Sequence, residues 1–286
     1  MPNRYAIDKT LMIDELRLHY RDWGGRGWPL LLLHGLDSTG HIWDLLAPLL
    51  VEEARVIALD LRGHGLSDKP DAPYDFPTVG GDVLAAIEAL ELSRPVLVGH
   101  AYGARLALWI AARQPDLVSG IVLIDGAIVE LNVISWHQAQ QQLAPPPSAG
   151  LDVETYKDSI LADMPQGIIT PAVETAIMAG MEIDADGKVH PRLPREYYMR
   201  YVRAMWEQPL GELYEDVTCP VLMIPVRDRA RDAQTAAARA ELGLARAEEA
   251  IADLEVQWIE ESIHDAPLQH PHRLAEAILS FLRERV

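Results

Sequence analysis

The sequence predicts an α/β fold in which a mostly parallel sheet is covered by helices on both faces. Two observations lead to this fold class: short apolar runs recur along the chain, and helical patterns separate most of them. A chain of 286 residues, of which 49% are hydrophobic, is long enough to bury one large core and to carry an insertion.

The predicted elements follow in chain order. Residues 9–13 and 16–23 alternate around a polar turn and predict an antiparallel hairpin at one edge of the sheet. Short apolar runs predict strands at residues 30–34, 55–60, 95–99, 119–125, 220–224 and 254–260. Helical patterns predict helices at residues 42–53, 76–90, 101–114 and 271–285.

The alternation of strands and helices stops between residues 127 and 217, where no convincing strand is found. A structureless loop of that length is implausible in a compact domain, so we predict a helical lid over the carboxyl edge of the sheet. The predicted organisation is therefore a core of residues 1–126 and 218–286 and a lid of residues 127–217. A second excursion, residues 232–253, is rich in Ala, Glu and Arg and predicts an exposed helix.

The charge balance argues against a polyanionic partner. The net charge is −18, whereas nucleic-acid binding needs a basic surface. No apolar run approaches the roughly 18 residues of a membrane helix, and the first residues do not resemble a signal peptide. We therefore expect a cytoplasmic protein without a membrane or nucleic-acid partner, of open oligomeric state. The single cysteine, Cys219, excludes an intramolecular disulfide, and its setting favours a buried strand start.

Residues 98–104 have the spacing of a nucleophile elbow but lack the nucleophile. In the pattern G-x-S-x-G, a serine sits on a strained turn between a strand and a helix, and small residues two positions away keep side chains out of the bend. Gly99 and Gly103 keep this spacing around Ala101. Because a methyl group cannot attack a substrate, either a parental serine was exchanged for Ala101 or the chain is a natural non-enzyme on an enzyme scaffold.

Four motifs together resemble the α/β-hydrolase superfamily, and the resemblance covers nearly the whole chain. They are His34-Gly35 after the first parallel strand, the segment of residues 60–68 (Asp-Leu-Arg-Gly-His-Gly-Leu-Ser-Asp) after the second, the elbow, and a late aspartate and histidine. The resemblance implies an α/β-hydrolase fold and a triad in the order nucleophile, acid, histidine, each at the carboxyl end of a strand.

The resemblance assigns the base to His264, which follows the strand predicted at residues 254–260 and precedes the terminal helix. Asp228 follows the strand at residues 220–224 and matches the usual position of the acid, so we favour it. Its rival is Asp125, at the end of the preceding strand, a position from which some dehalogenase-like relatives supply the acid.

Other polar residues of these motifs are interpreted as structural. His100 resembles the usual filler of the elbow, His64 sits in a turn, and Asp60 is expected to hold the turn at residues 62–65. His34 is expected either to line the pocket or to brace the oxyanion loop.

The resemblance also places an oxyanion hole at the backbone N–H groups of Leu36 and Tyr102. These donors survive the alanine at position 101, so the site can still bind a carbonyl oxygen. The pocket is predicted to be apolar and suited to an ester or a lactone, although most candidate residues will belong to the core. The candidates are His34, Trp43, Ile128, Trp136, Met178, Tyr197 and Trp206. The lid residues Tyr198, Tyr201, Val202 and Met205 recur at helical spacing and are expected to pack on the core.

The predicted function is hydrolysis of carboxylic esters or lactones through an acyl-enzyme, without a metal or organic cofactor, in a form inactivated by Ala101. Retention of both Asp228 and His264 favours a deliberate serine-to-alanine change over gradual loss. A non-catalytic receptor on the same fold is the alternative from another class, and carbon–carbon hydrolysis or cofactor-free peroxidation would use the same triad. Epoxide hydrolases and haloalkane dehalogenases rank lower because they need an aspartate at position 101.

Overall fold

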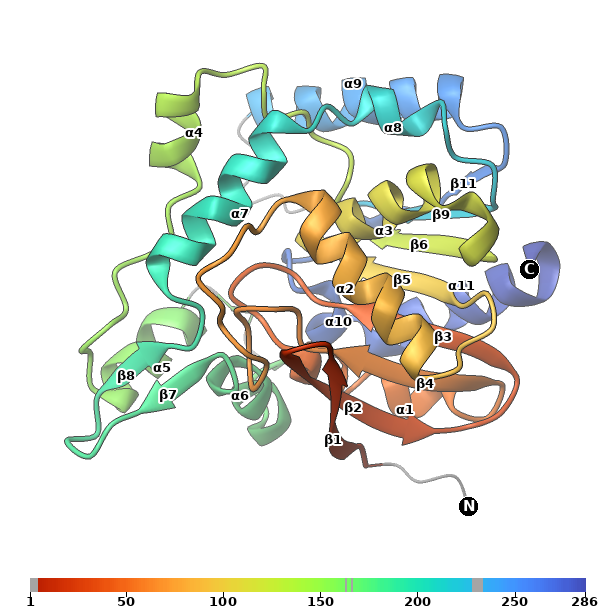
Figure 1. Cartoon of the computed structure of the whole chain (residues 1–286). Helices are drawn as coiled ribbons and strands as arrows, with labels where there is room; N and C mark the ends of the chain where they lie inside the picture. Colours follow the sequence, from red (N-terminus) through yellow and green to blue (C-terminus); the bar gives the residue numbers. More distant parts are fainter. Residues whose placement is uncertain (1–4, 163, 166, 228–233) are drawn as a thin grey trace.

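An eight-stranded sheet forms the centre of the molecule (Figure 1). The computed structural model describes residues 5–162, 164–165, 167–227 and 234–286. The strands of this sheet are β1 (Ile7–Ile13), β2 (Leu16–Gly24), β3 (Trp28–Leu33), β4 (Ala54–Leu59), β5 (Val96–His100), β6 (Gly120–Ile124), β9 (Val221–Ile224) and β11 (Leu254–Val256). Their order is β1-β2-β4-β3-β5-β6-β9-β11, and only β2 is antiparallel to its neighbours. The predicted fold class and edge hairpin are confirmed.

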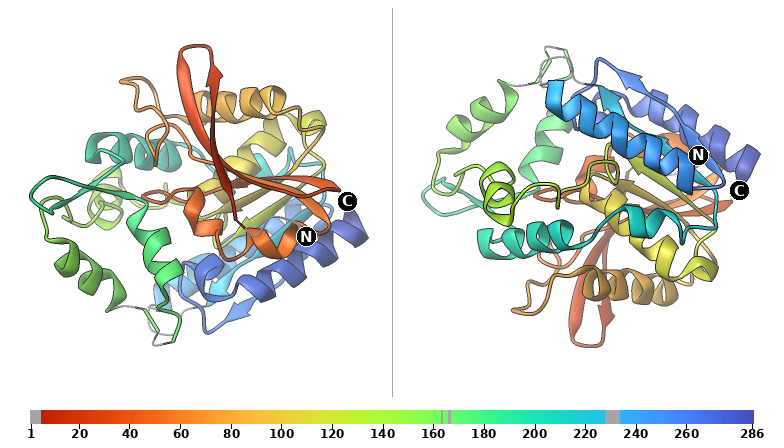
Figure 2. Two further views of the ribbon diagram at one scale, coloured as in Figure 1. Left: turned by 90° about the horizontal axis from the view of Figure 1, so that it is seen from below. Right: turned by 90° about the horizontal axis from the view of Figure 1, so that it is seen from above.

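The central strands bury side chains on both faces, as their continuous apolar runs predict. In β3, Leu31 and Leu33 belong to one buried cluster and Leu30 and Leu32 to the other, because successive side chains of a strand point to opposite faces. Helices lie on either side of the sheet (Figure 2). The first face carries α2 (Phe76–Ala89), α3 (Tyr102–Arg113), α8 (Gly211–Tyr214) and α9 (Gln234–Ala250), and the second carries α1 (Ala47–Leu50), α10 (Ala266–Gln269) and α11 (Pro271–Arg285).

Two predicted elements differ from the structure, each near a proline. The prediction of one helix over residues 42–53 is wrong: a 3₁₀ turn, η1 (Gly40–Trp43), precedes the short α1. Pro48 has no N–H group and fits only the first turn of a helix, so it separates the two. The strand predicted at residues 254–260 is divided into β11 and β12 (Ile259–Glu260). Its partner changes from β9 to β10 (Val226–Arg227) where Pro225 interrupts the neighbouring chain.

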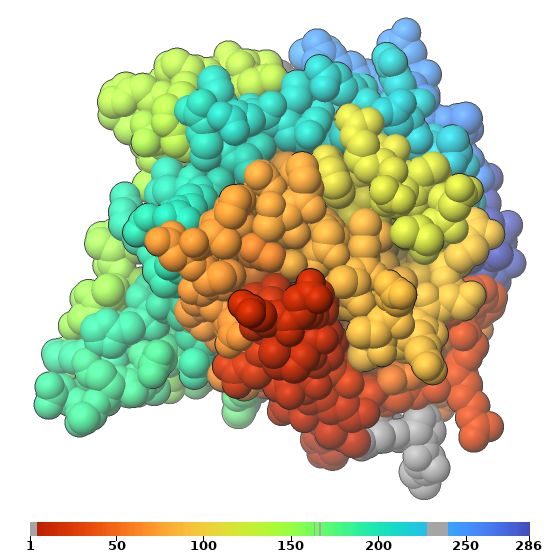
Figure 3. Space-filling view, in the orientation of Figure 1, coloured from red at the N-terminus to blue at the C-terminus, as the bar shows by residue number. Residues whose placement is uncertain are grey.

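Most of the chain between β6 and β9 forms an insertion at one end of the molecule, drawn in green to teal in Figures 1 and 3, and the chain then returns to the first face of the sheet at α8. The segment between β6 and β9 contains α4 (Trp136–Gln142), α5 (Val153–Leu161), α6 (Pro171–Met178), α7 (Arg195–Glu207), α8, and the strands β7 (Met181–Ile183) and β8 (Val189–Pro191). The expectation of no strand here is therefore wrong, because β7 and β8 pair as an antiparallel hairpin. Each strand is only three residues long, too short for a periodic pattern, and the turn is held by Asp184, which accepts hydrogen bonds from the N–H groups of Asp186 and Lys188. The division into core and lid domains stays a prediction.

Helix α9 is less exposed than its composition predicts. Leu244 and Ala247 belong to the buried cluster on the first face, whereas Leu242 is 57% exposed. A Cβ at Gly243 would lie 1.8 Å from the carbonyl oxygen of Ile128, so α9 packs directly on the segment that follows β6.

Cys219 is buried just before β9, as its sequence context predicts, and burial raises the pKa of its thiol to about 11. Within the described residues, no helix combines the length and apolar character needed to cross a membrane.

Candidate active site

Ala101 occupies the sharp turn between β5 and α3, with φ 51° and ψ −109°. A positive φ of this kind at a non-glycine residue costs about 1–3 kcal/mol and persists only where the surroundings enforce it. Close packing enforces it here: a Cβ on Gly99 would lie 2.3 Å from the backbone of Gly103, and a Cβ on Gly103 would lie 2.0 Å from the carbonyl oxygen of Leu33. The backbone therefore has the elbow geometry, with a methyl group where a nucleophile would project.

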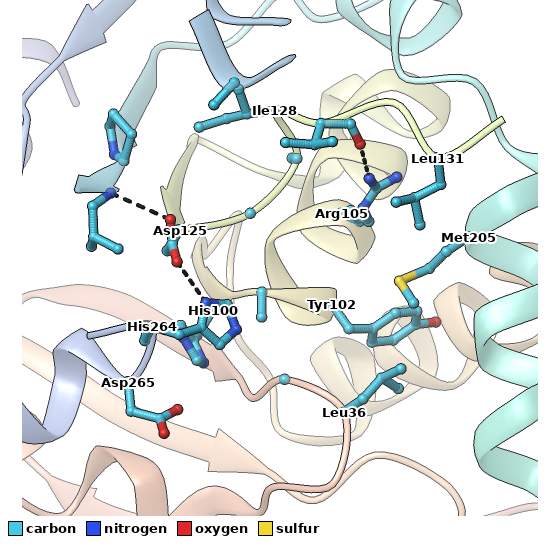
Figure 4. Close-up of a pocket in the computed structure, with 18 of the residues that line it drawn as sticks. Leu36, His100, Tyr102, Arg105, Asp125, Ile128, Leu131, Met205, His264 and Asp265 are labelled. Atoms are coloured by element: carbon cyan, nitrogen blue, oxygen red, sulfur yellow. Dashed lines mark hydrogen bonds and ion pairs between the residues drawn. The ribbon is translucent and has the colours of Figure 1, made fainter. Parts of the chain in front are cut away.

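His264 and Asp125 form a pair beside the elbow (Figure 4). The Nδ1 atom of His264 lies 2.5 Å from Oδ2 of Asp125. The second carboxylate oxygen, Oδ1, accepts a hydrogen bond of 3.3 Å from the N–H group of Val226. Asp125 follows β6 and His264 lies between β12 and α10, so the fold brings together two segments that are far apart in the sequence.

Asp228, which the sequence favoured as the acid, lies outside the described residues. The structure therefore leaves that preference untested. Its rival Asp125 is described and makes the direct contact with the His264 ring.

His100 holds the backbone of His264 from inside the elbow. Its Nε2–H group donates a 2.9 Å hydrogen bond to the carbonyl oxygen of His264, and the two rings lie 4.7 Å apart. Burial and the neighbouring His264 lower the pKa of His100 to about 4, so this ring is neutral at pH 7. Its Nδ1 atom is buried and unpartnered within the described part of the chain, which agrees with a structural rather than a proton-carrying role.

The loop after β3 approaches the elbow closely. A Cβ built on Gly35 would lie 3.1 Å from the Cβ of Ala101, so glycine keeps the space next to residue 101 open. The N–H groups of Leu36 and Tyr102 make no hydrogen bond to any described residue, and both residues line the same cavity as Ala101. These are the two donors predicted for the oxyanion hole.

His34 braces this loop rather than facing a ligand. Its Nδ1–H donates to the carbonyl oxygen of Gly35 at 2.7 Å, and its Nε2 accepts from the N–H group of Leu61 at 3.0 Å. The ring is fully buried, and burial lowers its pKa. Of the two roles predicted for His34, the structure shows the bracing one.

Asp60 binds the neighbouring turns, as predicted. It accepts hydrogen bonds from the N–H groups of Gly40 and Leu66 and from the ring of His19. Burial alone would raise the pKa of this carboxyl, but the His19 contact and the other donors hold it well below its usual range. His64 is likewise structural: its buried Nδ1–H donates to the carbonyl oxygen of Arg62.

A cavity of about 400 Å³ opens at the carboxyl ends of the strands and contains the elbow and the His264–Asp125 pair. Its volume suits a small organic ligand. Most of its wall is apolar, and the insertion closes one side with Tyr198 and Met205 from α7. The apolar lining residues include Leu36, Ala127, Ile128, Leu131, Leu143, Met205 and Trp258.

Ile128 is the one predicted pocket residue that lines this cavity. Trp43 is instead fully buried in the core of the second face. Trp136 and Trp206 pack against each other at 5.9 Å, and Tyr197 stacks on Tyr74 at 4.9 Å. Trp136 and Trp206 thus pack within the insertion and Tyr197 joins it to the segment before α2, so the expected placement of these aromatic residues in the cavity wall is corrected. Met178 packs beside a small cluster under the β7–β8 hairpin.

Arg105 introduces a positive charge into this wall. It lies on α3 one helical turn after Ala101, and only 6% of its surface is exposed. One guanidinium nitrogen, Nη2, donates to the carbonyl oxygen of Val129 (Figure 4), whereas Nη1 is buried without a partner among the described residues.

Comparison with known proteins agrees with this architecture. A family model described as alpha/beta hydrolase fold matches residues 29–161. A 2-(acetamidomethylene)succinate hydrolase from Mesorhizobium japonicum is 30% identical over 224 residues, which cover 77% of each chain. The chain belongs to the α/β-hydrolase superfamily. The crystal structure of E-2-(acetamidomethylene)succinate hydrolase has a TM-score of 0.80 to this chain at 26% identity and covers 98% of this chain and 100% of its own.

Other relatives of this α/β-hydrolase are named for different reactions. A soluble epoxide hydrolase from Corynebacterium sp. is 37% identical over 114 residues, or 40% of each chain. An enol-lactonase from Burkholderia xenovorans LB400 shares the fold, with a TM-score of 0.74 at 21% identity and coverage of 96% of this chain and 100% of its own. These relatives are named for hydrolysis of different substrates.

Three residues that line the cavity of this α/β-hydrolase were not predicted to do so, although the sequence contains some signal for each: Arg105, Tyr198 and Met205. Arg105 is a lone charge within the first two turns of an otherwise apolar helix that starts at the elbow. Tyr198 and Met205 follow the helical spacing of α7, but spacing does not show whether a face meets the core or a cavity. The described residues contain no group of three or more His, Cys, Asp and Glu side chains arranged to hold a metal ion.

Proposed function

We propose that this chain is a serine hydrolase of carboxylic esters or lactones in a form that lacks its nucleophile. One observation carries the proposal: Ala101 keeps the strained backbone of a nucleophile elbow, and it shares a cavity with the His264–Asp125 pair. Strained backbone is typical of functional sites, and an oriented histidine is the usual base for a nucleophile beside it. The combination therefore favours a catalytic side chain at position 101.

With serine at position 101, His264 acts as the base. The Nδ1–H group of His264 donates to Asp125, so Nε2 is the ring nitrogen that takes the proton of the serine hydroxyl. The serine oxygen then bonds to the substrate carbonyl carbon, and the N–H groups of Leu36 and Tyr102 bind the oxyanion. The imidazolium returns the proton to the leaving alkoxide, so an alcohol departs and an acyl-enzyme remains. Water, deprotonated by the same histidine, releases the acid.

The proposal assigns the orienting acid to Asp125. Both of its carboxylate oxygens are engaged, one by His264 and one by the N–H group of Val226. This pair of contacts fixes the carboxylate plane and therefore the orientation of the histidine ring. A hydrogen bond from an imidazole N–H to a carboxylate is of the charge-assisted kind, which is stronger than one between neutral groups.

The alanine form retains the means to bind a carbonyl group but cannot form an acyl-enzyme. Loss of a serine nucleophile in a well-developed triad lowers kcat by about 10⁶-fold. The oxyanion donors are backbone groups and do not depend on the side chain at position 101.

Restoring the serine tests the proposal. We compare the chain as it stands with Ala101→Ser and with the double variant Ala101→Ser/His264→Ala, using p-nitrophenyl esters, lactones and 2-(acetamidomethylene)succinate. The first two classes follow from the site, and the third from the name of the relative described above. Activity that appears only in the serine form and needs His264 supports the proposal. A folded serine form that stays at background on every substrate refutes it.

A non-catalytic binding protein is the second candidate, because the alanine itself favours it and the cavity is intact. Ligand binding by both forms, without turnover by the serine form, would establish this alternative. An Ala101→Asp variant assayed with an epoxide tests separately for epoxide hydrolysis, the reaction for which one relative is named. Carbon–carbon hydrolysis would appear as turnover of a vinylogous diketone substrate by the serine form alone.

A further inference from the structure

Arg105 is placed to face a ligand in the cavity. It lines the cavity together with Ala101 and Tyr102. Residues four apart in an α-helix lie on the same face, and long side chains lean toward the N-terminus of the helix. Arg105 therefore lies on the same face of α3 as residue 101, about 6 Å further along the helix axis, and its guanidinium reaches the carbonyl oxygen of Val129.

The hydrogen-bonding capacity of this guanidinium is only partly used by the protein. Nη2 donates to the carbonyl oxygen of Val129, and Nη1 has no partner within the described chain. No described carboxylate forms an ion pair with Arg105. The charge of Glu130 acts on Arg105 without a direct contact, because its Oε1 accepts from the N–H groups of Leu210 and Gly211.

A buried cation with an unused hydrogen-bond donor is unfavourable in an apolar wall. Burial lowers the pKa of Arg105 to about 10, so the side chain still carries its charge at pH 7. An arginine presents planar, paired donors that match a carboxylate. A ligand carboxylate would supply the missing acceptor, and with it a charge in direct contact with the guanidinium.

We propose that Arg105 binds a carboxylate group of the ligand, so that the substrate is a short ester or lactone that itself carries a carboxylate. The reacting carbonyl would lie at residue 101 and the carboxylate one helical turn away. Half-esters of small dicarboxylic acids have this arrangement. This inference deepens the proposed function, because the position of the reacting carbonyl rests on it, whereas the binding of an anion at Arg105 does not.

Binding to the chain as it stands tests the inference without turnover. Monomethyl succinate and dimethyl succinate are nearly the same size and differ in one negative charge. Isothermal titration calorimetry with Ala101 retained should show tighter binding of the monoester by about tenfold or more, as expected of hydrogen bonds between charged groups. Equal binding of the two esters, or binding of neither, overturns the inference.

Variants then assign the preference to one side chain. Arg105→Met should abolish the preference for the monoester, while Arg113→Met, a change on the same helix at an exposed ion pair with Asp216, should leave it intact. A folded Arg105→Met protein that keeps the preference refutes the inference and leaves Arg105 a structural role.

If Arg105→Met does not fold, Arg105→Lys provides the second measurement. Lysine keeps the charge but not the planar pair of donors. A reduced preference supports the inference, and an unchanged one overturns it. Selective monoester binding together with an inactive Ala101→Ser form would refute the proposed hydrolysis while leaving the anion site intact.

Discussion

The contact between Asp125 and His264 allows a sharp prediction for Asp125→Asn in the Ala101→Ser background. The carboxylate accepts on both oxygens: Oδ1 from the N–H group of Val226 and Oδ2 from Nδ1–H of His264. An asparagine must keep its amide oxygen toward Val226, because the opposite orientation would set two donors against each other. Its NH₂ group then faces Nδ1, which has to accept.

This reversed hydrogen bond moves the proton of the His264 ring to Nε2. The atom that should take the serine proton is then already protonated, and the imidazolium also loses the negative charge 2.5 Å away. Loss of the orienting aspartate in a serine triad lowers kcat by about 10⁴-fold, or about 5 kcal/mol. Binding should change much less, because Asp125 orients the base and does not hold the substrate.

The assay is a kcat and KM determination on a short p-nitrophenyl ester across pH 6–9. Asp228→Asn in the same background is the matched control, and it should retain activity within about tenfold of the serine form. A larger loss in Asp228→Asn than in Asp125→Asn would refute the assignment and return the role to the residue that the sequence favoured.

Three further predictions concern stability and specificity. Burial raises the pKa of Asp37 to about 6, above its value of 3.8 in the unfolded chain, so its ionisation opposes folding at neutral pH; relative to Asp37→Asn, the parent should gain about 1.3 kcal/mol of stability in urea unfolding as pH falls from 7 to 5. Asparagine also accepts the positive φ of this position. Gly103→Ala should lower Tm strongly because its Cβ meets a backbone oxygen at 2.0 Å, whereas Gly81→Ala, at an open position of α2, should stabilise by up to about 1 kcal/mol. In the serine form, Met205→Ala should raise kcat/KM for long acyl chains relative to short ones by about tenfold, and Trp206→Phe, outside the cavity wall, should not.

Each of these outcomes can contradict the structure. An Asp37→Asn variant with the same pH dependence of stability as the parent would place the carboxyl in solvent. Equal effects of the two glycine substitutions would mean that the elbow is loosely packed. A uniform loss of activity on all chain lengths in Met205→Ala would point to a role in the chemistry rather than in substrate size.

The fold was predictable because its signals are local. The run Leu30–Leu33 is apolar on both faces of a strand, and the spacing of Gly99 and Gly103 is read within five residues. The error over residues 42–53 was also local, since Pro48 marks a break in the helix.

The site was only partly predictable because its remaining features depend on contacts between distant segments. Asp125 and Asp228 both follow predicted strands, and nothing in the residues themselves shows which one reaches His264, which comes 139 positions after Asp125 but only 36 after Asp228. The aromatic residues Trp136 and Trp206 gave no sign of facing each other instead of a ligand. The sequence shows Arg105 as a charge in an apolar helix, but only the three-dimensional structure shows that its Nη1 lacks a hydrogen-bond partner among the described residues and that the residue lines the cavity.

The backbone at residue 101 is held by its neighbours and not by its own side chain. The N–H group of Ala101 donates to the carbonyl oxygen of Ile124, and Gly126 packs so closely that a Cβ there would lie 2.3 Å from the carbonyl oxygen of Ala101. Alanine and serine are nearly isosteric, so exchange between them should leave Tm almost unchanged. A single nucleotide separates their codons. If the proposed function holds, the reaction can therefore be lost or regained in one mutational step with little effect on folding.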